Sequence, residues 1–96
     1  MEMFFFGRFH AREGEAEAVA AALRDVLAPS RAEAGCRAIA AFRSTRDPRL
    51  FYVHSRWVDE AAFDLHATLP HTVRFVERVM PLLDQPFEAT RANALG

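Results

Sequence analysis

The chain has 96 residues, a formal net charge of −1 and 51% hydrophobic residues, which predict a single domain over residues 1–96 with one modest core. The 12 basic residues balance the 13 acidic ones and form no basic run interleaved with aromatics, so we expect no nucleic-acid partner. The sequence has neither a long apolar segment nor the pattern of a signal peptide, so we expect no membrane partner. The only cysteine, Cys36, cannot form an internal disulfide and fits the reducing cytoplasm, which is the predicted location.

The first predicted elements are a strand over residues 3–11 and a helix over residues 14–29. The strand sequence, MFFFGRFHA, carries aromatic side chains on both alternating faces, which is typical of a central strand covered on both sides. The helix has hydrophobic residues at helical spacing and charged residues on the opposite side. Pro29 is expected to limit its continuation, and Gly35 to end the short turn that follows.

Residues 36–45 and 50–58 predict an antiparallel hairpin. The first segment, CRAIAAFRST, alternates weakly between hydrophobic and polar positions, whereas the second, LFYVHSRWV, alternates clearly and contains the only tryptophan, Trp57. A polar turn that includes Pro48 joins them, as expected for two strands that pair with each other.

The remaining residues predict helices over 59–67 and 71–83 and a last strand over 86–95. Asp59 is expected to cap the first of these helices, because its carboxylate can accept hydrogen bonds from the free N–H groups of the first turn. Pro81 is expected to kink or end the second. The order strand, helix, strand, strand, helix, strand predicts a ferredoxin-like α+β fold, in which a four-stranded antiparallel sheet carries helices on one face.

The opposite face of such a sheet would stay uncovered and substantially apolar. Nine phenylalanines are many for a core of this size, so part of the aromatic surface should cover a ligand cavity or a second subunit. We therefore predict a homodimer that forms through the sheet face.

Residues 50–75 hold three of the four histidines and the tryptophan, and a chemical site is expected there first. His66 follows Phe63 by three positions on one helix, and a partly buried histidine can accept or donate a proton near neutral pH. The alternative is that His66 caps a backbone carbonyl or lies at a cavity rim without chemistry. Trp57 shares a strand face with Ser55 and needs a partner for its N–H if it is buried.

Motifs for bound cofactors are absent from the sequence. The four glycines never approach the spacing of a dinucleotide-binding loop, which argues against a flavin or nicotinamide site of that type. Neither H-E-x-x-H nor C-x-x-C occurs, so we expect no structural metal. The predicted cofactor content is therefore none.

Three short stretches and two histidines occur in an order that is similar to one known family. They are RAEAGC at residues 31–36, RSTRDP at residues 43–48 and WVDEA at residues 57–61, followed by His66 and His71. Together they resemble the antibiotic biosynthesis monooxygenase (ABM) domain, which has an E-x-G-C element, a D-P turn, a strand ending E-x-W-x-D and a histidine-bearing helix. The resemblance covers nearly the whole chain. It implies the fold of the dimeric α+β barrels.

Two positions depart from the family pattern. Ser55 stands where a glutamate usually precedes the tryptophan by two residues, and Ile39 stands where an aromatic is common. If that glutamate orients the helix histidine in the relatives, His66 lacks its orienting partner in this chain.

The resemblance implies a monooxygenase that needs no cofactor and oxidises a phenol, a quinol or another electron-rich aromatic small molecule with dioxygen. The protein would remove a proton, hold the resulting anion in a dry pocket and keep water away from the intermediate. By analogy His66 is the proton acceptor, and Trp57 is a cavity wall and an orienting donor. The expected substrate-binding residues are Phe63, His71, Phe75 and Ser55.

Two other functions of the same fold remain open from the sequence. A haem-degrading enzyme ranks lower, because the first strand lacks the asparagine that the haem-degrading relatives carry. A non-catalytic dimer that binds a small ligand is the stronger alternative, and Ser55 favours it.

Overall fold

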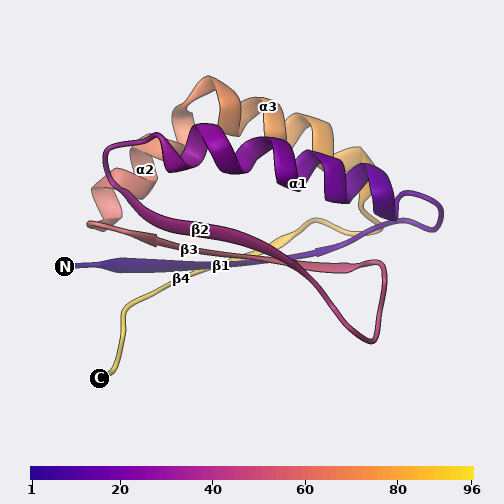
Figure 1. Ribbon diagram of the computed structural model, residues 1–96, viewed down its shortest axis with the longest axis horizontal. Helices are drawn as coiled ribbons and strands as arrows, with labels where there is room; N and C mark the ends of the chain where they lie inside the picture. The colour runs from indigo at the N-terminus through magenta and orange to yellow at the C-terminus, as the bar shows by residue number, and fades with distance from the viewer.

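The computed structural model describes residues 1–96 as one four-stranded antiparallel sheet with helices on one of its faces (Figure 1). In chain order the elements are β1 (Met3–His10), α1 (Ala16–Arg31), β2 (Cys36–Arg43), β3 (Leu50–Trp57), α2 (Glu60–Thr68), α3 (Pro70–Val79), the 3-10 helix η1 (Met80–Leu82) and β4 (Glu88–Ala92). The strand order across the sheet is β2-β3-β1-β4, which confirms the predicted ferredoxin-like α+β fold. None of the helices combines the length and apolar character that a membrane crossing requires.

Strand β1 is central, as its two-sided aromatic pattern predicts. It pairs with β3 along its whole length, from Met3 opposite Trp57 to His10 opposite Leu50, and with β4 on its other edge. Its side chains alternate between the helix-covered face, where Met3 and Phe9 are buried, and the bare face, where Phe6 is exposed. The burial of alternate residues therefore follows the strand period of two.

Helix α1 begins and ends two residues later than predicted. The expected end at Pro29 is wrong, because the helix continues to Arg31. A proline loses only its own N–H, and beyond it the Ala32 N–H still donates to the Ala28 carbonyl at 3.2 Å. The guanidinium of Arg31 then donates to the Ile39 carbonyl at 2.9 Å, which fixes the last turn of α1 to β2.

The segment after β3 follows the predicted order, with two short helices in succession. The Asp59 carboxylate accepts a hydrogen bond from the Ala62 N–H at 2.9 Å, which confirms the predicted cap of α2. Pro70 occupies the first turn of α3, where its missing N–H needs no partner. Helix α3 ends at Val79, and Pro81 lies in the 3-10 helix that follows. Strand β4 is shorter than predicted.

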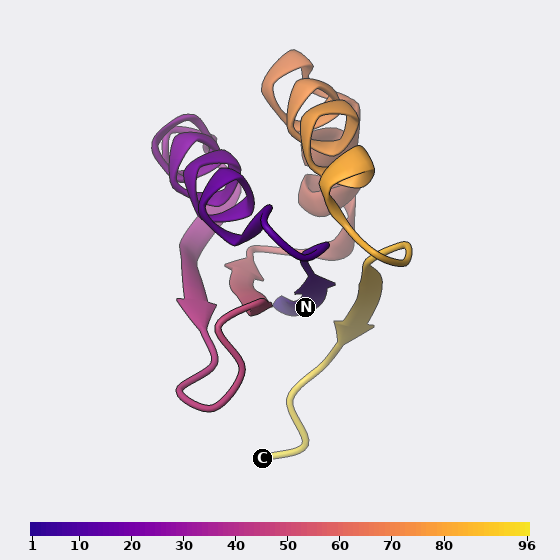
Figure 2. The same ribbon diagram turned by 90° about the vertical axis from the view of Figure 1, so that its right-hand side faces the viewer.

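The core lies between the sheet and the helices and has two parts. The larger cluster joins β1, α1, β3 and α3 through residues such as Phe9, Leu23 and Val53. A smaller cluster of Met3, Trp57 and Phe63 lies beside α2. Figure 2 shows α1 beside the α2–α3 segment above the sheet, with the C-terminal tail on the other side.

The uncovered face of the sheet carries aromatic side chains, as expected from the alternation. Phe6 and Tyr52 from the two central strands are exposed there, at 48% and 40% of their full accessible surface. Phe42 on β2 is 53% exposed. His54 on β3 stands opposite Phe6, with its ring centroid 5.0 Å from that of Phe6.

The end of β1 is fastened by a histidine held between two aspartates. His10 Nδ1 lies 2.6 Å from an Asp84 oxygen, in the segment before β4, and His10 Nε2 lies 2.8 Å from an Asp47 oxygen, in the β2–β3 turn. The Asp84 and Asp47 carboxylates raise the pKa of His10 above its usual value of 6.5. The pKa of Asp47 is lowered by the Arg49 backbone N–H and by His10. We call these residues, His10, Asp47 and Asp84, the His10 cluster.

Candidate active site

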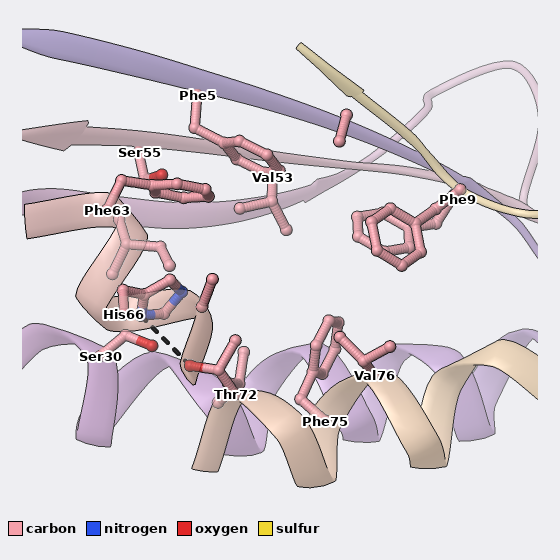
Figure 3. A pocket seen from close by; sticks show the side chains of 15 residues that line it. Phe5, Phe9, Ser30, Val53, Ser55, Phe63, His66, Thr72, Phe75 and Val76 are labelled. Carbon is pink, nitrogen blue, oxygen red and sulfur yellow. Dashed lines mark hydrogen bonds between the residues drawn. The ribbon is translucent and has the colours of Figure 1, made fainter. Parts of the chain in front are cut away.

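An apolar cavity of about 200 Å³ lies between the sheet and the helices (Figure 3). Eleven of its 15 lining residues are hydrophobic, with phenylalanines from β1, α2, α3 and the segment before β4. The four polar residues of the lining are Ser30, Ser55, His66 and Thr72. A small apolar cavity with a few polar groups is the usual form of a small-molecule site.

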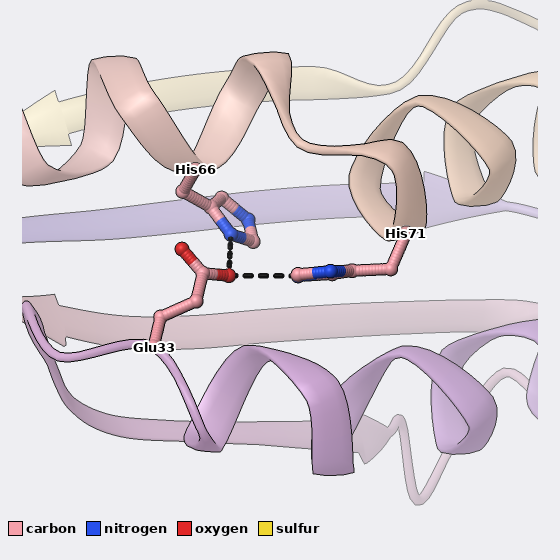
Figure 4. A group of neighbouring side chains, drawn as sticks. All are labelled: Glu33, His66 and His71. Carbon is pink, nitrogen blue, oxygen red and sulfur yellow. Dashed lines mark hydrogen bonds and ion pairs between the residues drawn. The ribbon is translucent and has the colours of Figure 1, made fainter.

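Beside the cavity, one carboxylate contacts two histidines (Figure 4). Glu33 Oε2 lies 2.6 Å from His66 Nδ1 and 2.7 Å from His71 Nε2. The three side chains are largely buried, with exposed fractions of 11%, 9% and 19% respectively. We call them the Glu33 cluster. An ionised carboxylate only accepts hydrogen bonds, so both imidazoles donate an N–H to it.

A close packing contact brings Glu33 to the histidine-bearing helix. Gly35, two residues further on, packs so tightly against α2 that a Cβ at this position would lie 2.5 Å from the Ala62 Cβ. The Val58 N–H also donates to the Gly35 carbonyl at 2.9 Å. The glycine therefore lets the turn after α1 lie directly against α2, where Glu33 meets His66.

The hydrogen bonds of His66 fix its tautomer. Both of its polar contacts use Nδ1: the 2.6 Å bond to Glu33, and a longer 3.3 Å contact to the Thr72 hydroxyl. With the proton on Nδ1, neutral His66 carries a lone pair on Nε2. Figure 3 shows this second nitrogen on the cavity side of the ring. The arrangement can therefore accept a proton from a molecule in the cavity.

The expectation that Ser55 leaves His66 without an orienting carboxylate is wrong. Glu33, from the turn after α1, takes that position instead of a residue on β3. Ser55 has a different partner, because the Trp57 indole N–H donates to its hydroxyl at 2.8 Å. Both residues are buried, and this bond satisfies the indole N–H.

Trp57 lies behind the cavity and does not form its wall. It is fully buried and is not among the lining residues. Its ring centroid lies 4.5 Å from that of His66, so the indole packs against the imidazole. Because its N–H is already bonded to Ser55, it has no donor left to orient a substrate.

The Glu33 cluster also has the composition of a metal site. Its three ligand atoms lie within 4.8 Å of one another, and two imidazoles with one carboxylate suit zinc or iron. Two ligands bound to zinc would lie about 3.3 Å apart, given bonds of about 2.0–2.1 Å and tetrahedral angles. The observed separations of 2.6 and 2.7 Å are those of hydrogen bonds.

The sequence matches the family described as antibiotic biosynthesis monooxygenase over residues 4–78. The chain belongs to this family. Among solved structures, PA3566 from Pseudomonas aeruginosa is 33% identical, with a TM-score of 0.91 over 99% of this chain and 95% of that one. Rv0793 from Mycobacterium tuberculosis is 27% identical, with a TM-score of 0.95 over 100% and 97%. SO0527 from Shewanella oneidensis is 31% identical, with a TM-score of 0.89 over 95% and 88%.

The predicted site residues of this ABM-family chain fall into two groups. Ser55, Phe63, His66 and Phe75 line the cavity. Trp57 and His71 stand outside the lining, Trp57 against the His66 ring and His71 against Glu33.

Glu33, Ser30 and Thr72 also belong to the site and were not predicted from the sequence. The signal for Glu33 was present, since it is the glutamate of the E-x-G-C element, and the glycine of that element is what brings it to α2. No comparable signal marks Ser30 or Thr72, which are ordinary polar residues of helices.

Proposed function

We propose that this ABM-family protein is a monooxygenase that needs no cofactor and oxidises an electron-rich phenol or hydroquinone with dioxygen. The observation that carries the proposal is His66, with one nitrogen held by Glu33 and the other free toward an apolar cavity. The family description, antibiotic biosynthesis monooxygenase, supports the reaction class.

In the proposed reaction, His66 Nε2 takes the phenolic proton and Glu33 stabilises the imidazolium that forms. The phenolate passes electrons to dioxygen, and a carbon–oxygen bond forms at an electron-rich ring carbon. The peroxide then breaks its O–O bond: one oxygen stays on the ring, which becomes a quinone, and the other leaves as water with two hydrogens of the substrate. The substrate supplies all four electrons, so no external reductant is consumed.

The cavity lining suits this chemistry. Its 11 hydrophobic residues exclude water, which strengthens the interaction of the phenolate with the few polar groups present and protects a peroxide from hydrolysis. By this proposal Phe63 and Phe75 contact the aromatic ring of the substrate. Trp57, Ser55 and His71 act indirectly: Ser55 holds the indole of Trp57 against His66, and His71 holds Glu33.

The test is His66→Ala, assayed with an oxygen electrode on a panel of hydroquinones. We expect oxygen consumption to fall by about 10²–10⁴-fold, the usual contribution of a positioned general base. The matched control is His71→Ala, which also removes one donor to Glu33 but leaves the cavity base in place, and it should retain most of the activity. Turnover by His66→Ala at the wild-type rate would refute the role of His66.

A ligand-binding protein without catalysis is the second candidate, because the buried bond between Glu33 and His66 also has a purely structural explanation. In that case neither protein would consume oxygen, and His66→Ala would lower the free energy of unfolding by about 1–3 kcal/mol by leaving Glu33 short of a donor. Oxygen consumption by the wild type distinguishes the two functions, and thermal melts show how much of any loss in His66→Ala comes from lower stability.

We also propose that the protein forms a homodimer through the bare face of the sheet. The support is the exposure of Phe6, Tyr52 and Phe42 on that face, which a second copy would cover. Sedimentation at micromolar concentration should give twice the chain mass of 10.8 kDa, and Phe6→Glu should shift the protein toward the monomer. A monomeric wild type would overturn the dimer.

A further inference from the structure

One polar atom of the cavity is free for a ligand, the Nε2 of His66. Both polar contacts of this ring use Nδ1, so Nε2 has no partner in the chain. The only side-chain nitrogen or oxygen of the protein that is both covered and unpartnered is Ser30 Oγ. His66 Nε2 therefore keeps accessible surface, and Figure 3 shows it on the cavity side of the ring.

The three hydroxyls of the lining offer a ligand much less. Ser30 Oγ is covered, so no ligand reaches it. Ser55 is 1% exposed, and its hydroxyl already accepts the hydrogen bond from the Trp57 indole. The Thr72 hydroxyl lies 3.3 Å from His66 Nδ1 and so belongs to the same end of the cavity as the imidazole. We call this end, formed by Ser30, Ser55, His66 and Thr72, the polar end.

The opposite end, which we call the apolar end, carries only hydrophobic side chains. Figure 3 shows Phe9, Phe75 and Val76 there, and the Phe87 ring stacks on Phe9 with its centroid 4.8 Å away. A ligand hydroxyl among these side chains would give up its hydrogen bonds to water without gaining another, which weakens binding. Hydrocarbon is favoured there, because its transfer out of water is favourable. The ligand that fits is polar at one end and hydrocarbon at the other.

The volume of the cavity limits the size of the ligand. A dry cavity of about 150 Å³ holds benzene, whereas drug-sized ligands occupy about 300–1,000 Å³. The cavity of about 200 Å³ therefore admits one aromatic ring or two fused rings. A planar system of three or four fused rings would require the helices to move away from the sheet.

We propose that the substrate is a phenol with a single hydroxyl on one or two fused rings. The inference rests on the proposed function and narrows it, because it ranks such phenols above hydroquinones of the same size. The hydroxyl donates to His66 Nε2, and the rings occupy the apolar end. When the proton moves to His66, the negative charge of the phenolate stays beside the imidazolium. A second hydroxyl on the far side of the rings would lie among phenylalanines.

The test is anaerobic titration calorimetry of the wild type with three compounds of one ring system, 1-naphthol, naphthalene and 1,5-dihydroxynaphthalene. We expect 1-naphthol to bind most tightly. Naphthalene should bind about 10-fold more weakly, because it donates no hydrogen bond to His66. The dihydroxy compound should bind about 10- to 100-fold more weakly, because its second hydroxyl is buried without a partner. Affinity for either compound that equals or exceeds the affinity for 1-naphthol, or no binding of 1-naphthol, would overturn the proposal.

The variant His66→Leu tests which atom holds the hydroxyl. Leucine removes the acceptor and keeps an apolar side chain, so 1-naphthol should bind about 10-fold more weakly than to wild type. Naphthalene is the internal control and should bind no more weakly than to wild type. If the variant still prefers 1-naphthol to naphthalene as strongly as the wild type does, another group holds the hydroxyl and the proposal is wrong. The wild-type series decides the proposal even if His66→Leu does not fold.

A fourth compound, 9-phenanthrol, tests the size limit. Its three fused rings should not bind to wild type but should bind to Phe87→Ala, which enlarges the apolar end and leaves His66 in place. Binding to wild type as tight as that of 1-naphthol would refute the limit, as would the failure of a folded Phe87→Ala to bind the compound.

These titrations involve no oxygen, so they separate this inference from the proposed function. The expected order of affinities without any oxygen uptake would remove only the oxygenase. Oxygen uptake that depends on His66, together with equal affinities for 1-naphthol and 1,5-dihydroxynaphthalene, would remove only the preference for a single hydroxyl.

Discussion

The Glu33 cluster and the His10 cluster lie at opposite ends of β1 and β3. They contain histidine and carboxylate in opposite proportions. The Glu33 cluster has one carboxylate between two histidines and is buried beside α2. The His10 cluster has one histidine between two carboxylates, and its aspartates are about 40% exposed. The hydrogen-bond lengths, 2.6 to 2.8 Å, are alike in both.

The number of free nitrogens distinguishes the two clusters. Both nitrogens of His10 face carboxylates, which only accept, so below its raised pKa the ring carries two protons and has no lone pair left for chemistry. His66 uses one nitrogen for Glu33 and keeps the other for the cavity. The histidine of the His10 cluster is therefore a structural cation, whereas His66 of the Glu33 cluster is a candidate base. The number of ring nitrogens that contact carboxylates makes the difference.

The largest difference between the two clusters is expected when one carboxylate in each is replaced by its neutral amide. Glu33→Gln should lower oxygen consumption with a hydroquinone on the order of 10²-fold, because the neutral amide no longer stabilises the imidazolium of His66. Asp84→Asn, the matched change in the His10 cluster, should leave turnover unchanged. Equal losses in the two variants, measured with the oxygen electrode, would show that the Glu33 cluster has no special chemical role.

The second largest effect is expected from a change in the packing that brings Glu33 to α2. Gly35→Ala places a Cβ 2.5 Å from the Ala62 Cβ, so the turn and α2 must separate. Overpacking of this kind costs about 1–3 kcal/mol in the free energy of unfolding, and we expect a parallel loss of turnover as Glu33 moves from His66. Denaturant melts measure the first effect. Adding Ala62→Gly should recover part of both, and a double variant no better than Gly35→Ala would argue against the clash.

The smallest expected effect is the pH dependence of the His10 cluster. The pKa of His10 is raised in the folded protein, so its contribution to stability is complete below about pH 6.5 and is lost as pH rises through the raised value. The lowered pKa of Asp47 adds stability above about pH 3.8 that is lost as pH falls through the lowered value. The Tm difference between wild type and His10→Gln should therefore be largest between about pH 3.8 and pH 6.5 and should shrink above neutral pH. A difference that is constant from pH 5 to 9 would contradict the assignment.

The fold could be predicted because its signals are local. The two-sided strand, the clear alternation of residues 50–58 and the Asp59 cap each depend on residues close in sequence. Pro29 misled the prediction for the same reason: its effect on α1 is offset by the bond from Arg31 to Ile39 on a neighbouring strand.

The site could be predicted only in part. His66 is visible because few residue types exchange protons near neutral pH. Its partner Glu33 lies 33 positions away, and no periodicity connects a turn residue to a helix across that distance. The family pattern places the carboxylate at position 55 on β3, whereas in this chain it comes from the turn after α1. The unpaired state of Ser30 depends on everything around it, so no sequence pattern can reveal it.

The two ends of the cavity come from different parts of the chain, and this has a consequence for divergence within the family. The polar end depends on the last turn of α1, the turn after it, α2 and the first turn of α3, whereas the apolar end is built by Phe9, Phe75 and Phe87, with the rings of Phe9 and Phe87 stacked at 4.8 Å. Substitutions among these three residues change the shape of the cavity and leave the proposed proton acceptor His66 and its partner Glu33 untouched. Under the proposed function, descendants of this chain can thus acquire new substrates through changes at the apolar end while they keep the histidine and carboxylate of the polar end.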